Sequence, residues 1–370
     1  MTRWSEPIER MLRRIDDTAG RVKDAFPHWS DPATGAWVTT PHGDWTGGYW
    51  VGMLWGAHAL TGDRKYRDLA ARGVERLRAR VDAETGFKSF PFYYAGATGW
   101  ALAGDTAARD VALACARAYR RLYSPALRLV PLGALAEEGA HTGPAETSID
   151  SLQTAPFLFW AAREGAFEVR DIALNHAERV IGLHLRDDSS FIQSSSLDPA
   201  TGALVEHYTH KGHSDRSTWG RAQAWGTLFS TMCFGEEPSR RDWLDAAVRG
   251  AGWWMAHVPA DHVAYWDFDD PAIPNTERDT AATAIASAAL LKLALVAPEG
   301  GPYRAFAEAT VEALTGRYLT PAGILTEACF NKRPDARPMD AANRCEFIVG
   351  SYYLFESLLA LHGTIDPGRI

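Results

Sequence analysis

The sequence predicts an all-α protein, an (α/α)6 barrel in which six outer helices enclose six inner helices. Two observations predict this fold. Segments with one apolar stripe and one charged face alternate with segments that are apolar nearly all round, and long polar linkers precede several of the latter. An amphipathic helix is covered on one side, whereas a helix that is apolar on all sides is buried on most of them. A helical solenoid is the alternative, but the apolar segments are too uniform to line an open concave face.

The outer helices share a short turn, a charged opening, and Ala and Leu at three- and four-residue spacing. They are expected near 6–22, at 61–70 and 103–112 with their continuations, and from about 168, 239 and 302 onward. The inner helices carry few charges, and they are expected at 48–60, 90–102, 150–164, 219–233, 280–296 and 346–362. No break in composition divides the chain, so residues 1–370 are expected to form a single domain.

Three long linkers, at 127–147, 187–217 and 258–279, each precede an inner helix and are rich in Gly, Pro, His and Asp. Loops of this length in a compact domain are usually functional. In an alternating barrel they all lie on one rim, together with the N-termini of the inner helices. Short strands are conceivable in the second and third linkers, but no sheet core is predicted.

Composition excludes several classes of function. The net charge is −8 and there is no basic run, which argues against nucleic acid as a partner. No stretch approaches the roughly 20 apolar residues of a membrane span, and the first residues contain no apolar signal region. The four cysteines lie far apart and are expected to be reduced core thiols, so we expect a cytoplasmic protein. Fourteen Trp fit either carbohydrate platforms or a wide helical core.

Asp150 is the candidate catalytic residue. It stands just inside the polar start of the third inner helix, after Ser148, which we expect to be the N-cap. A carboxyl group in a partly apolar pocket has its pKa raised by burial and can act as general acid and base. The plain alternative is a first-turn Asp that stabilises its helix. Pro156 follows closely, and we expect it to kink this helix.

Two further inner-helix starts carry candidate substrate-binding residues. At the first, Asp44 can accept hydrogen bonds from sugar hydroxyls and Trp45 can stack on a sugar ring, although an N-cap Asp and a core Trp are equally consistent with the pattern. At the fourth, Arg221 lies between Trp219 and Trp225, where it can bind a carboxylate through two hydrogen bonds.

No metal or organic cofactor is expected. His207, His210 and His213 share one linker, but their spacing matches no strong metal-binding pattern, and we expect rim residues that contact ligand or solvent. The acidic run at 265–270 could suggest calcium, yet Asp and aromatic residues that close the loop are favoured. G-x-S-x-G, P-loop and G-x-G-x-x-G motifs are absent from the sequence, so hydrolase triads, nucleoside triphosphates and dinucleotides have no support.

Several blocks together resemble the unsaturated glucuronyl hydrolases, glycoside hydrolase family 88. They are DWTGGYWVGMLW at 44–55, STWGRAQAWG at 217–226, YWDFD at 265–269 and GSYYLFESLL at 350–359. The resemblance spans nearly the whole chain and implies an (α/α)6 barrel. It also implies that a terminal 4,5-unsaturated uronic acid is hydrated at its C4=C5 double bond, with an Asp that protonates C4 while water adds at C5. Asp150 matches that Asp, and residues that match sugar-holding positions are Trp45, Trp219, Arg221 and Trp225.

The chain departs from the family pattern at three positions. Where the family has H-D-x-G-F, this sequence reads GFKSF at 86–90, so that Phe87 replaces a second active-site Asp. A family Gln falls at Lys211 and a family His falls at Gln193. Lys211 and Lys88 are hypothesised to make the pocket more cationic, which suits a carboxylate, sulfate or phosphate group.

The sequence therefore predicts a glycoside hydrolase that acts on a terminal unsaturated uronic acid or a related sugar. The candidate substrate-binding residues are Asp44, Trp45, Gln193, His210, Lys211, Trp219, Arg221 and Trp225. One alternative is a diverged enzyme on the same barrel that acts on a saturated glucuronide or a glycosylated small metabolite. Another is a non-catalytic relative that binds sugar. The expected partner is a small carbohydrate, and the expected state is a monomer or a homodimer.

Overall fold

The structure, a computed structural model, describes residues 2–133, 135–136, 145–336 and 341–370. The predicted linker at 127–147 therefore lies partly outside the described residues, as do residue 1 and residues 337–340 of the predicted 1–370 domain.

The outer layer consists of helices with one buried stripe. They are α1 (Ser5–Val22), α3 (Arg64–Leu77), α6 (Thr106–Ala118), α8 (Arg170–His184), α10 (Arg241–His257) and α12 (Gly300–Arg317). In α1 the buried residues Ile8, Met11 and Ile15 recur at the spacing of one helix face. Each outer helix packs on the inner helix beside it.

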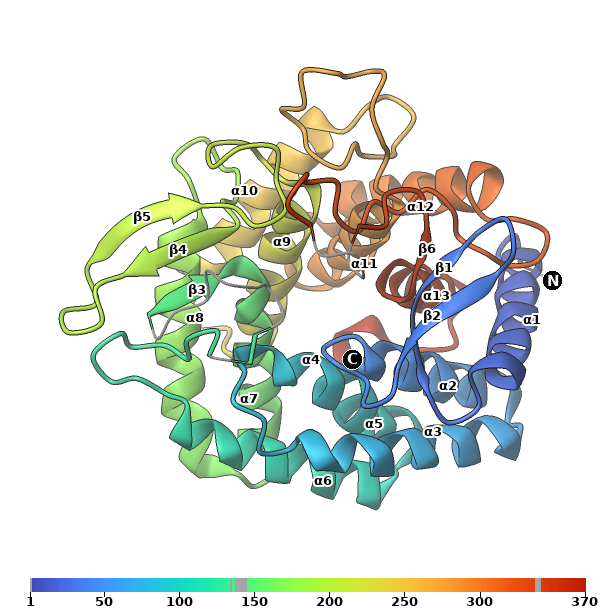
Figure 1. Cartoon of the computed structure of the whole chain (residues 1–370), viewed down its shortest axis with the longest axis horizontal. Helices are drawn as coiled ribbons and strands as arrows, with labels where there is room; N and C mark the ends of the chain where they lie inside the picture. Colours follow the sequence, from blue (N-terminus) through green and yellow to red (C-terminus); the bar gives the residue numbers. More distant parts are fainter. Residues whose placement is uncertain (1, 134, 137–144, 337–340) are drawn as a thin grey trace.

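The inner layer consists of helices buried nearly all round. Four of them are single helices: α2 (Gly47–Thr61), α9 (Gly220–Glu236), α11 (Thr280–Val296) and α13 (Ile348–His362). Another is a continuous helix formed by α4 (Ser89–Phe92), the π-helical turn η3 (Tyr93–Ala97) and α5 (Thr98–Ala103). In the last, the 3-10 turn η5 (Ile149–Gln153) leads into α7 (Thr154–Arg163). The colours in Figure 1 run once round this ring, and α13 packs against α2 to close it. The predicted (α/α)6 barrel is confirmed.

The connections differ between the two ends of the barrel. Those from inner to outer helices are short and form what we call the far rim, made of 62–63, 104–105, 164–169, 237–240 and 297–299. Gly104 is typical: it takes a left-handed conformation with φ +60°, donates its N–H to Trp100, and is followed by Asp105, which caps α6.

Connections from outer to inner helices are long and form the mouth rim. Its described parts are 23–46, 78–88, 119–133, 145–148, 185–219, 258–279, 318–336 and 341–347. These linkers contact one another; for example, Trp219 forms an isolated bridge with Asp267 from the next linker. They also contain the short 3-10 turns η1 (Arg78–Arg80), η2 (Gly86–Lys88) and η4 (Tyr119–Arg121). Two further turns, η6 (Phe167–Val169) and η7 (Pro367–Arg369), lie outside this rim.

The mouth rim carries two small antiparallel sheets. One has the order β2-β1-β6, from β1 (Phe26–Asp31), β2 (Ala36–Thr40) and β6 (Glu346–Phe347). The other has the order β3-β4-β5, from β3 (Glu146–Ser148), β4 (Ser194–Leu197) and β5 (Leu204–Tyr208). Short strands are conceivable from the sequence in two linkers. The linker at 187–217 contains β4 and β5, whereas the linker at 258–279 has only isolated bridges. The strands β1, β2, β3 and β6 were not predicted.

The expected helix start at Glu346 is wrong. Glu346 pairs with Ser30 as part of β6, and its buried carboxylate forms an ion pair with Arg14 of α1, so the last inner helix begins at Ile348. This pairing joins residues from the two ends of the chain, and a local sequence pattern contains no information about it.

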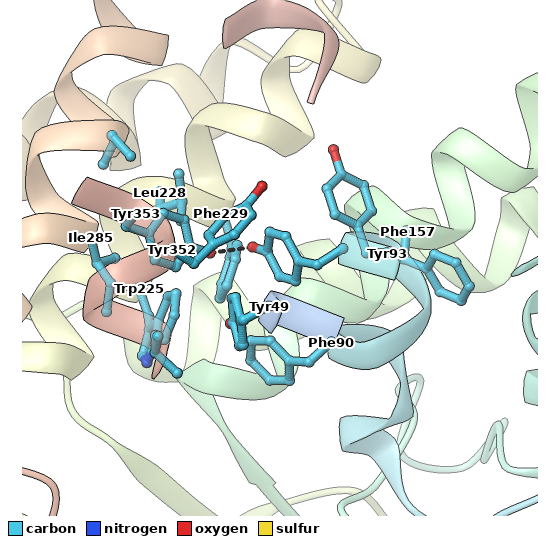
Figure 2. Close-up of a cluster of buried hydrophobic side chains, with 14 of the residues drawn as sticks. Tyr49, Phe90, Tyr93, Phe157, Trp225, Leu228, Phe229, Ile285, Tyr352 and Tyr353 are labelled. Atoms are coloured by element: carbon cyan, nitrogen blue, oxygen red, sulfur yellow. Dashed lines mark hydrogen bonds between the residues drawn. The ribbon is translucent and has the colours of Figure 1, made fainter. Parts of the chain in front are cut away.

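Aromatic side chains fill the barrel axis beneath the mouth rim. Figure 2 shows Tyr49, Phe90, Trp225 and Tyr353 converging from different inner helices. Tyr353 lies 5.6 Å from Trp225 and 5.7 Å from Tyr49 between ring centroids. The axis is therefore a packed core, and it forms the floor below the residues at the mouth.

The four cysteines are all buried and none forms a disulfide, as predicted. A search of the described helices finds none that is both long and apolar enough to cross a membrane.

Candidate active site

Asp150 lies in the 3-10 turn η5 rather than in the first turn of an α-helix. Just before it, β3 pairs with β4, and the Ile149 N–H donates to the Gln193 carbonyl at 2.8 Å. Ser148 occupies the N-cap position, but its hydroxyl makes no capping hydrogen bond, so the expected side-chain cap is wrong. Instead, the Ser151 hydroxyl donates back to the Ser148 carbonyl at 2.6 Å.

In place of the expected kink at Pro156, the helix changes its type shortly before this residue. The chain changes from 3-10 to α-helix between Gln153 and Thr154, and Pro156 lies in the first turn of α7. At that position the missing N–H of proline has no intrahelical partner to lose.

A buried histidine holds the Asp150 turn from below. The Val130 N–H donates to His176 Nδ1 at 3.1 Å, so Nε2 carries the proton and donates to the Ser151 carbonyl at 2.8 Å. Burial lowers the pKa of His176 to about 4. The imidazole is therefore neutral at pH 7 and acts as a fixed hydrogen-bond bridge between the mouth-rim segment 119–133 and the Asp150 turn.

Asp150 is buried near an aromatic residue of the barrel floor. It is 6% exposed. Burial raises the pKa of Tyr49 well above its usual value, and the charges of Tyr94 and of Asp150 itself add to the shift, which indicates that the carboxylate lies near the Tyr49 ring. Phe87, aligned by the resemblance with a second active-site Asp, is buried and lies 6.1 Å from Phe90 between ring centroids.

The η2 turn that carries Phe87 is tied to the Asp150 turn by a side-chain hydrogen bond. The Thr154 hydroxyl, next to η5, donates to the Gly86 carbonyl at 3.1 Å. An apolar ring therefore lies on the segment next to Asp150, in the place where the family pattern expects a carboxylate.

The ammonium group of Lys211 lies among three aromatic rings. Its Nζ is 5.8 Å from the centroid of Trp45, 5.9 Å from Trp219 and 5.2 Å from Phe330. These distances are within the range of cation–π attraction. We call Lys211, Trp45, Trp219 and Phe330 the cation cage. Three of its members were predicted as substrate-binding residues.

Gln193 holds the backbone that presents Lys211. Its Oε1 accepts hydrogen bonds from the Thr209 hydroxyl at 2.6 Å, from the His210 N–H at 2.9 Å and from the Lys211 N–H at 3.0 Å. The side-chain oxygen of Gln193 is thus engaged by the protein. His210 meets Gln193 through its backbone, while its ring packs edge-on against Tyr208 at 4.9 Å.

Arg221 is buried and its guanidinium has protein acceptors on both terminal nitrogens. Nη1 donates to Asp279 and to the Cys329 carbonyl, each at 2.6 Å, and Nη2 donates to the Phe330 carbonyl. The guanidinium also lies over the Trp219 ring at 4.4 Å. Arg221 therefore fixes two members of the cation cage, Trp219 and Phe330. These contacts account for the position of an Arg between two Trp residues in the sequence.

The remaining predicted residues lie at different depths. Trp225 is 1% exposed and stacks on Phe229 at 5.0 Å, so it belongs to the floor of the site. Asp44 lies on the rim, at φ +39°, and pairs with Arg80 at 3.5 Å.

The hypothesis that Lys88 adds charge to the pocket is wrong. Its Nζ donates to the Val81 carbonyl at 3.1 Å and lies 4.9 Å from the Tyr119 ring centroid. Both partners belong to mouth-rim segments, 78–88 and 119–133, but neither is a member of the cation cage.

Two residues of the site were not found from the sequence. Phe330 completes the cation cage, and His28 of β1 lies beneath it, 5.1 Å from the Phe330 ring. Burial, followed by the charge of Lys211, lowers the pKa of His28 to about 4. Neither residue belongs to a motif, and both reach the site through linkers whose course the sequence pattern does not determine.

The described residues contain no group of three or more His, Cys, Asp or Glu side chains that could hold a metal ion. The acidic run at 265–270 closes the loop, as favoured from the sequence. Asp267 accepts hydrogen bonds from the His213 N–H at 2.8 Å and the Ser217 hydroxyl at 2.7 Å, and Asp269 accepts from the Thr218 N–H at 2.7 Å.

Comparisons with known proteins give consistent results. No protein-family model matches the chain. The unsaturated glucuronyl hydrolase of Bacillus sp. (strain GL1) is 31% identical over 372 residues, which cover 97% of this chain and 96% of that protein. The unsaturated chondroitin disaccharide hydrolase of Streptococcus pyogenes serotype M1 is 28% identical over 384 residues, with 98% and 92% covered.

Solved structures extend the match to three dimensions. The crystal structure of the Bacillus sp. GL1 unsaturated glucuronyl hydrolase, responsible for the degradation of glycosaminoglycan, superposes with a TM-score of 0.89 at 30% identity, covering 97% of this chain and 96% of that one. An unsaturated glucuronyl hydrolase specific for heparin superposes with a TM-score of 0.88 at 25% identity, covering 98% of each chain.

Proposed function

This chain belongs to the unsaturated glucuronyl hydrolase family, and on that premise we propose that it releases a terminal 4,5-unsaturated uronic acid from a carbohydrate by hydrating the C4=C5 double bond. The observation that carries the proposal is the position of Asp150. Its carboxyl group lies at the start of an inner helix, 6% exposed, on the rim that also carries the cation cage.

Asp150 serves as both acid and base in this reaction. The protonated carboxyl group transfers its proton to C4 of the enol ether, and positive charge develops at C5 and the ring oxygen. Water then adds at C5 and gives its proton to the Asp150 carboxylate, which restores the starting state. The resulting hemiketal opens, and the bond to the leaving sugar breaks as the ring collapses. One carboxyl group is therefore sufficient, because the proton it gives is returned by the water.

The cation cage suits the carboxylate of the same sugar. A uronic acid carries a carboxylate on C5, and the Lys211 ammonium, held among Trp45, Trp219 and Phe330, offers positive charge in surroundings of low dielectric. The partly exposed ring of Trp45 offers an apolar face to a sugar. In the proposed complex Lys211 binds the carboxylate, Gln193 supports the Lys211 backbone, and Arg221 keeps Phe330 in place.

The test is a panel of unsaturated disaccharides, with the loss of ultraviolet absorbance of the conjugated double bond as the measurement. We expect turnover by the wild-type protein and a kcat that falls roughly 100- to 10,000-fold in the Asp150→Asn variant. Circular dichroism and Tm of the variant serve as the control for folding. Activity of Asp150→Asn within tenfold of wild type would refute the role of Asp150. Turnover of saturated glucuronides alone would refute the proposed substrate.

A further inference from the structure

Gln153 lies in the same 3-10 turn as Asp150, and the proposed reaction assigns no step to it. The two residues are three positions apart in η5, which runs from Ile149 to Gln153. A 3-10 helix has three residues per turn, so side chains at positions i and i+3 lie on the same face, one above the other. The Gln153 amide and the Asp150 carboxyl group therefore project from one side of the turn.

One end of the Gln153 amide is held by the tyrosines of the barrel floor. The Tyr94 hydroxyl donates to Gln153 Oε1 at 3.2 Å, and the same hydroxyl is hydrogen-bonded to the hydroxyl of Tyr353. The dashed line in Figure 2 marks this second bond at Tyr353. The rotation of the amide about its last bond is thus determined by residues of two other inner helices.

The other end of the amide is a buried donor. Gln153 is fully buried, and its Nε2 has no hydrogen-bond partner among the residues that the structure describes. Leaving a buried amide donor unpaired destabilises the folded state, so such a group calls for a physical explanation.

The tyrosine that orients Gln153 stacks on a tyrosine that lies near Asp150. The Tyr94 ring stacks on Tyr49 with centroids 4.3 Å apart, and the charge of Asp150 acts on Tyr49. Two observations, the period of the 3-10 turn and the stack of Tyr94 on Tyr49, thus place the Gln153 donor and the Asp150 carboxyl group on the same side of the turn. Hydrogen bonds in a site without ligand are often long and form fully only in the complex with substrate.

We propose that Gln153 is a positioning residue for Asp150, whose Nε2 donates a hydrogen bond to the Asp150 carboxylate in the substrate complex. This inference rests on the proposed function. The hydrogen bond holds the carboxylate after it has protonated C4 and while it waits for the proton of the attacking water. It also stabilises the charged form of Asp150 over the neutral form, which makes the group a stronger acid toward C4.

The test compares the pH profiles of kcat for wild type and Gln153→Leu on an unsaturated disaccharide. Asp150 must be protonated to deliver its proton, so activity falls as the pH rises through the pKa of Asp150. Loss of a hydrogen bond to the charged form moves this basic limb upward, by about one pH unit. We expect that shift together with a kcat lowered about tenfold at the optimum.

The matched control is Gln223→Leu. Gln223 is also buried, but both ends of its amide are used, because Oε1 accepts from the Phe191 N–H at 2.8 Å and Nε2 donates to the Gly250 carbonyl at 3.0 Å. This variant is expected to lower Tm without moving the basic limb. An equal shift in both variants, or a Gln153→Leu profile that coincides with wild type, would overturn the proposal.

Tyr94→Phe provides a second route in case Gln153→Leu fails to fold. It removes the hydroxyl that orients the amide and retains the ring, so a smaller upward shift of the basic limb is expected. No shift in the folded Tyr94→Phe protein would count against the proposal. These outcomes are distinct from a failure of the proposed function, in which wild type does not hydrate unsaturated disaccharides or Asp150→Asn retains its activity.

Discussion

The mouth rim and the far rim are built from the same helices, yet they differ in almost every respect. Connections at the far rim are short turns such as 62–63 and 104–105, each closed by a left-handed glycine and an Asp cap. Connections at the mouth rim are long, they carry both sheets and the cation cage, and Asp150 follows directly after one of them. Short turns satisfy the helix ends with local hydrogen bonds, whereas long linkers must be held by one another.

The difference is visible in what each rim uses to fix its side chains. At the far rim, Asp105 caps its own helix through the N–H of Ala108 at 3.0 Å. At the mouth rim, Arg221 joins the start of α9 to Asp279 of one linker and to the carbonyls of Cys329 and Phe330 in another. The candidate site lies where the contacts are long-range, because only those contacts bring residues from different linkers to one place.

The largest expected effect comes from removing the cation of a buried ion pair at each end of the barrel. Arg221 pairs with Asp279 at 2.6 Å near the mouth, and Lys292 pairs with Glu356 at 2.9 Å toward the far rim. Either cation replaced by Met leaves a buried carboxylate unpaired, so we expect Arg221→Met and Lys292→Met each to lower the free energy of unfolding by about 3–5 kcal/mol. Urea denaturation measures both.

Only the mouth variant is expected to change catalysis. Arg221→Met releases the Phe330 carbonyl and loosens the cation cage, so kcat/KM should fall at a temperature where both variants are folded. Lys292→Met should remain within about twofold of wild type, since Lys292 also binds the Pro367 carbonyl at 2.8 Å, away from the cation cage. Equal losses of kcat/KM in the two variants would contradict the separation of the two ends.

For each single residue, an intermediate effect is expected from acid, and it should begin at the mouth rim. Burial lowers the pKa of His28, His176 and His184 to about 4, and all three contact mouth-rim segments. Because the pKa in the unfolded chain is about 6.5, unfolding takes up a proton at each site between pH 6.5 and 4. The free energy of unfolding should therefore decrease as the pH falls through this window, by up to about 3 kcal/mol for each histidine.

Hydrogen exchange at pH 7 and pH 5 measures where this loss occurs. Amides of β3, β4 and η5 should lose protection before those of α11. A His176→Asn variant should be less stable than wild type at pH 7 but show a shallower decrease toward pH 5. Uniform loss of protection over the whole barrel would argue against an acid-sensitive mouth.

The smallest expected effect is at the far rim. Asp105→Ala removes the side-chain cap of α6, which should cost about 1 kcal/mol of stability. Since the change is local, kcat and KM for an unsaturated disaccharide should be unchanged. Thermal denaturation and steady-state kinetics test the two statements separately, and a change in KM would show that the two rims are coupled through the barrel.

The helices could be predicted well because their signals are local. The run at 280–296 is apolar on all sides and forms α11 with the same bounds. The strands could not be predicted, because β6 has only two residues and forms by pairing with β1 from the other end of the chain. Lys88 and Lys211 both precede an inner helix, and the sequence suggested the same role for both. In the structure Lys88 lies against Tyr119, whereas Lys211 enters the cation cage.

The candidate site was predicted in part for the same reason. Asp150, Trp45 and Trp219 lie next to inner-helix starts, and the alternation of helices brings those starts to one rim. Phe330 and His28 lie within linkers, where no periodic pattern applies. The proposed role of Gln153 depends on the 3-10 form of η5, and the sequence pattern indicated an α-helix there.

By itself the sequence determined that the helices form a ring, that the N-termini of the inner helices share one rim with the long linkers, and that Asp150 lies on this rim. The period of apolar residues sets which face of each helix is buried, and this information is contained in neighbouring residues. Tertiary structure alone decided which side chains share the mouth, that Arg221 supports Phe330, and that the Asp150 turn is 3-10. These depend on hydrogen bonds and packing between linkers far apart in the chain, whose energies no local segment contains.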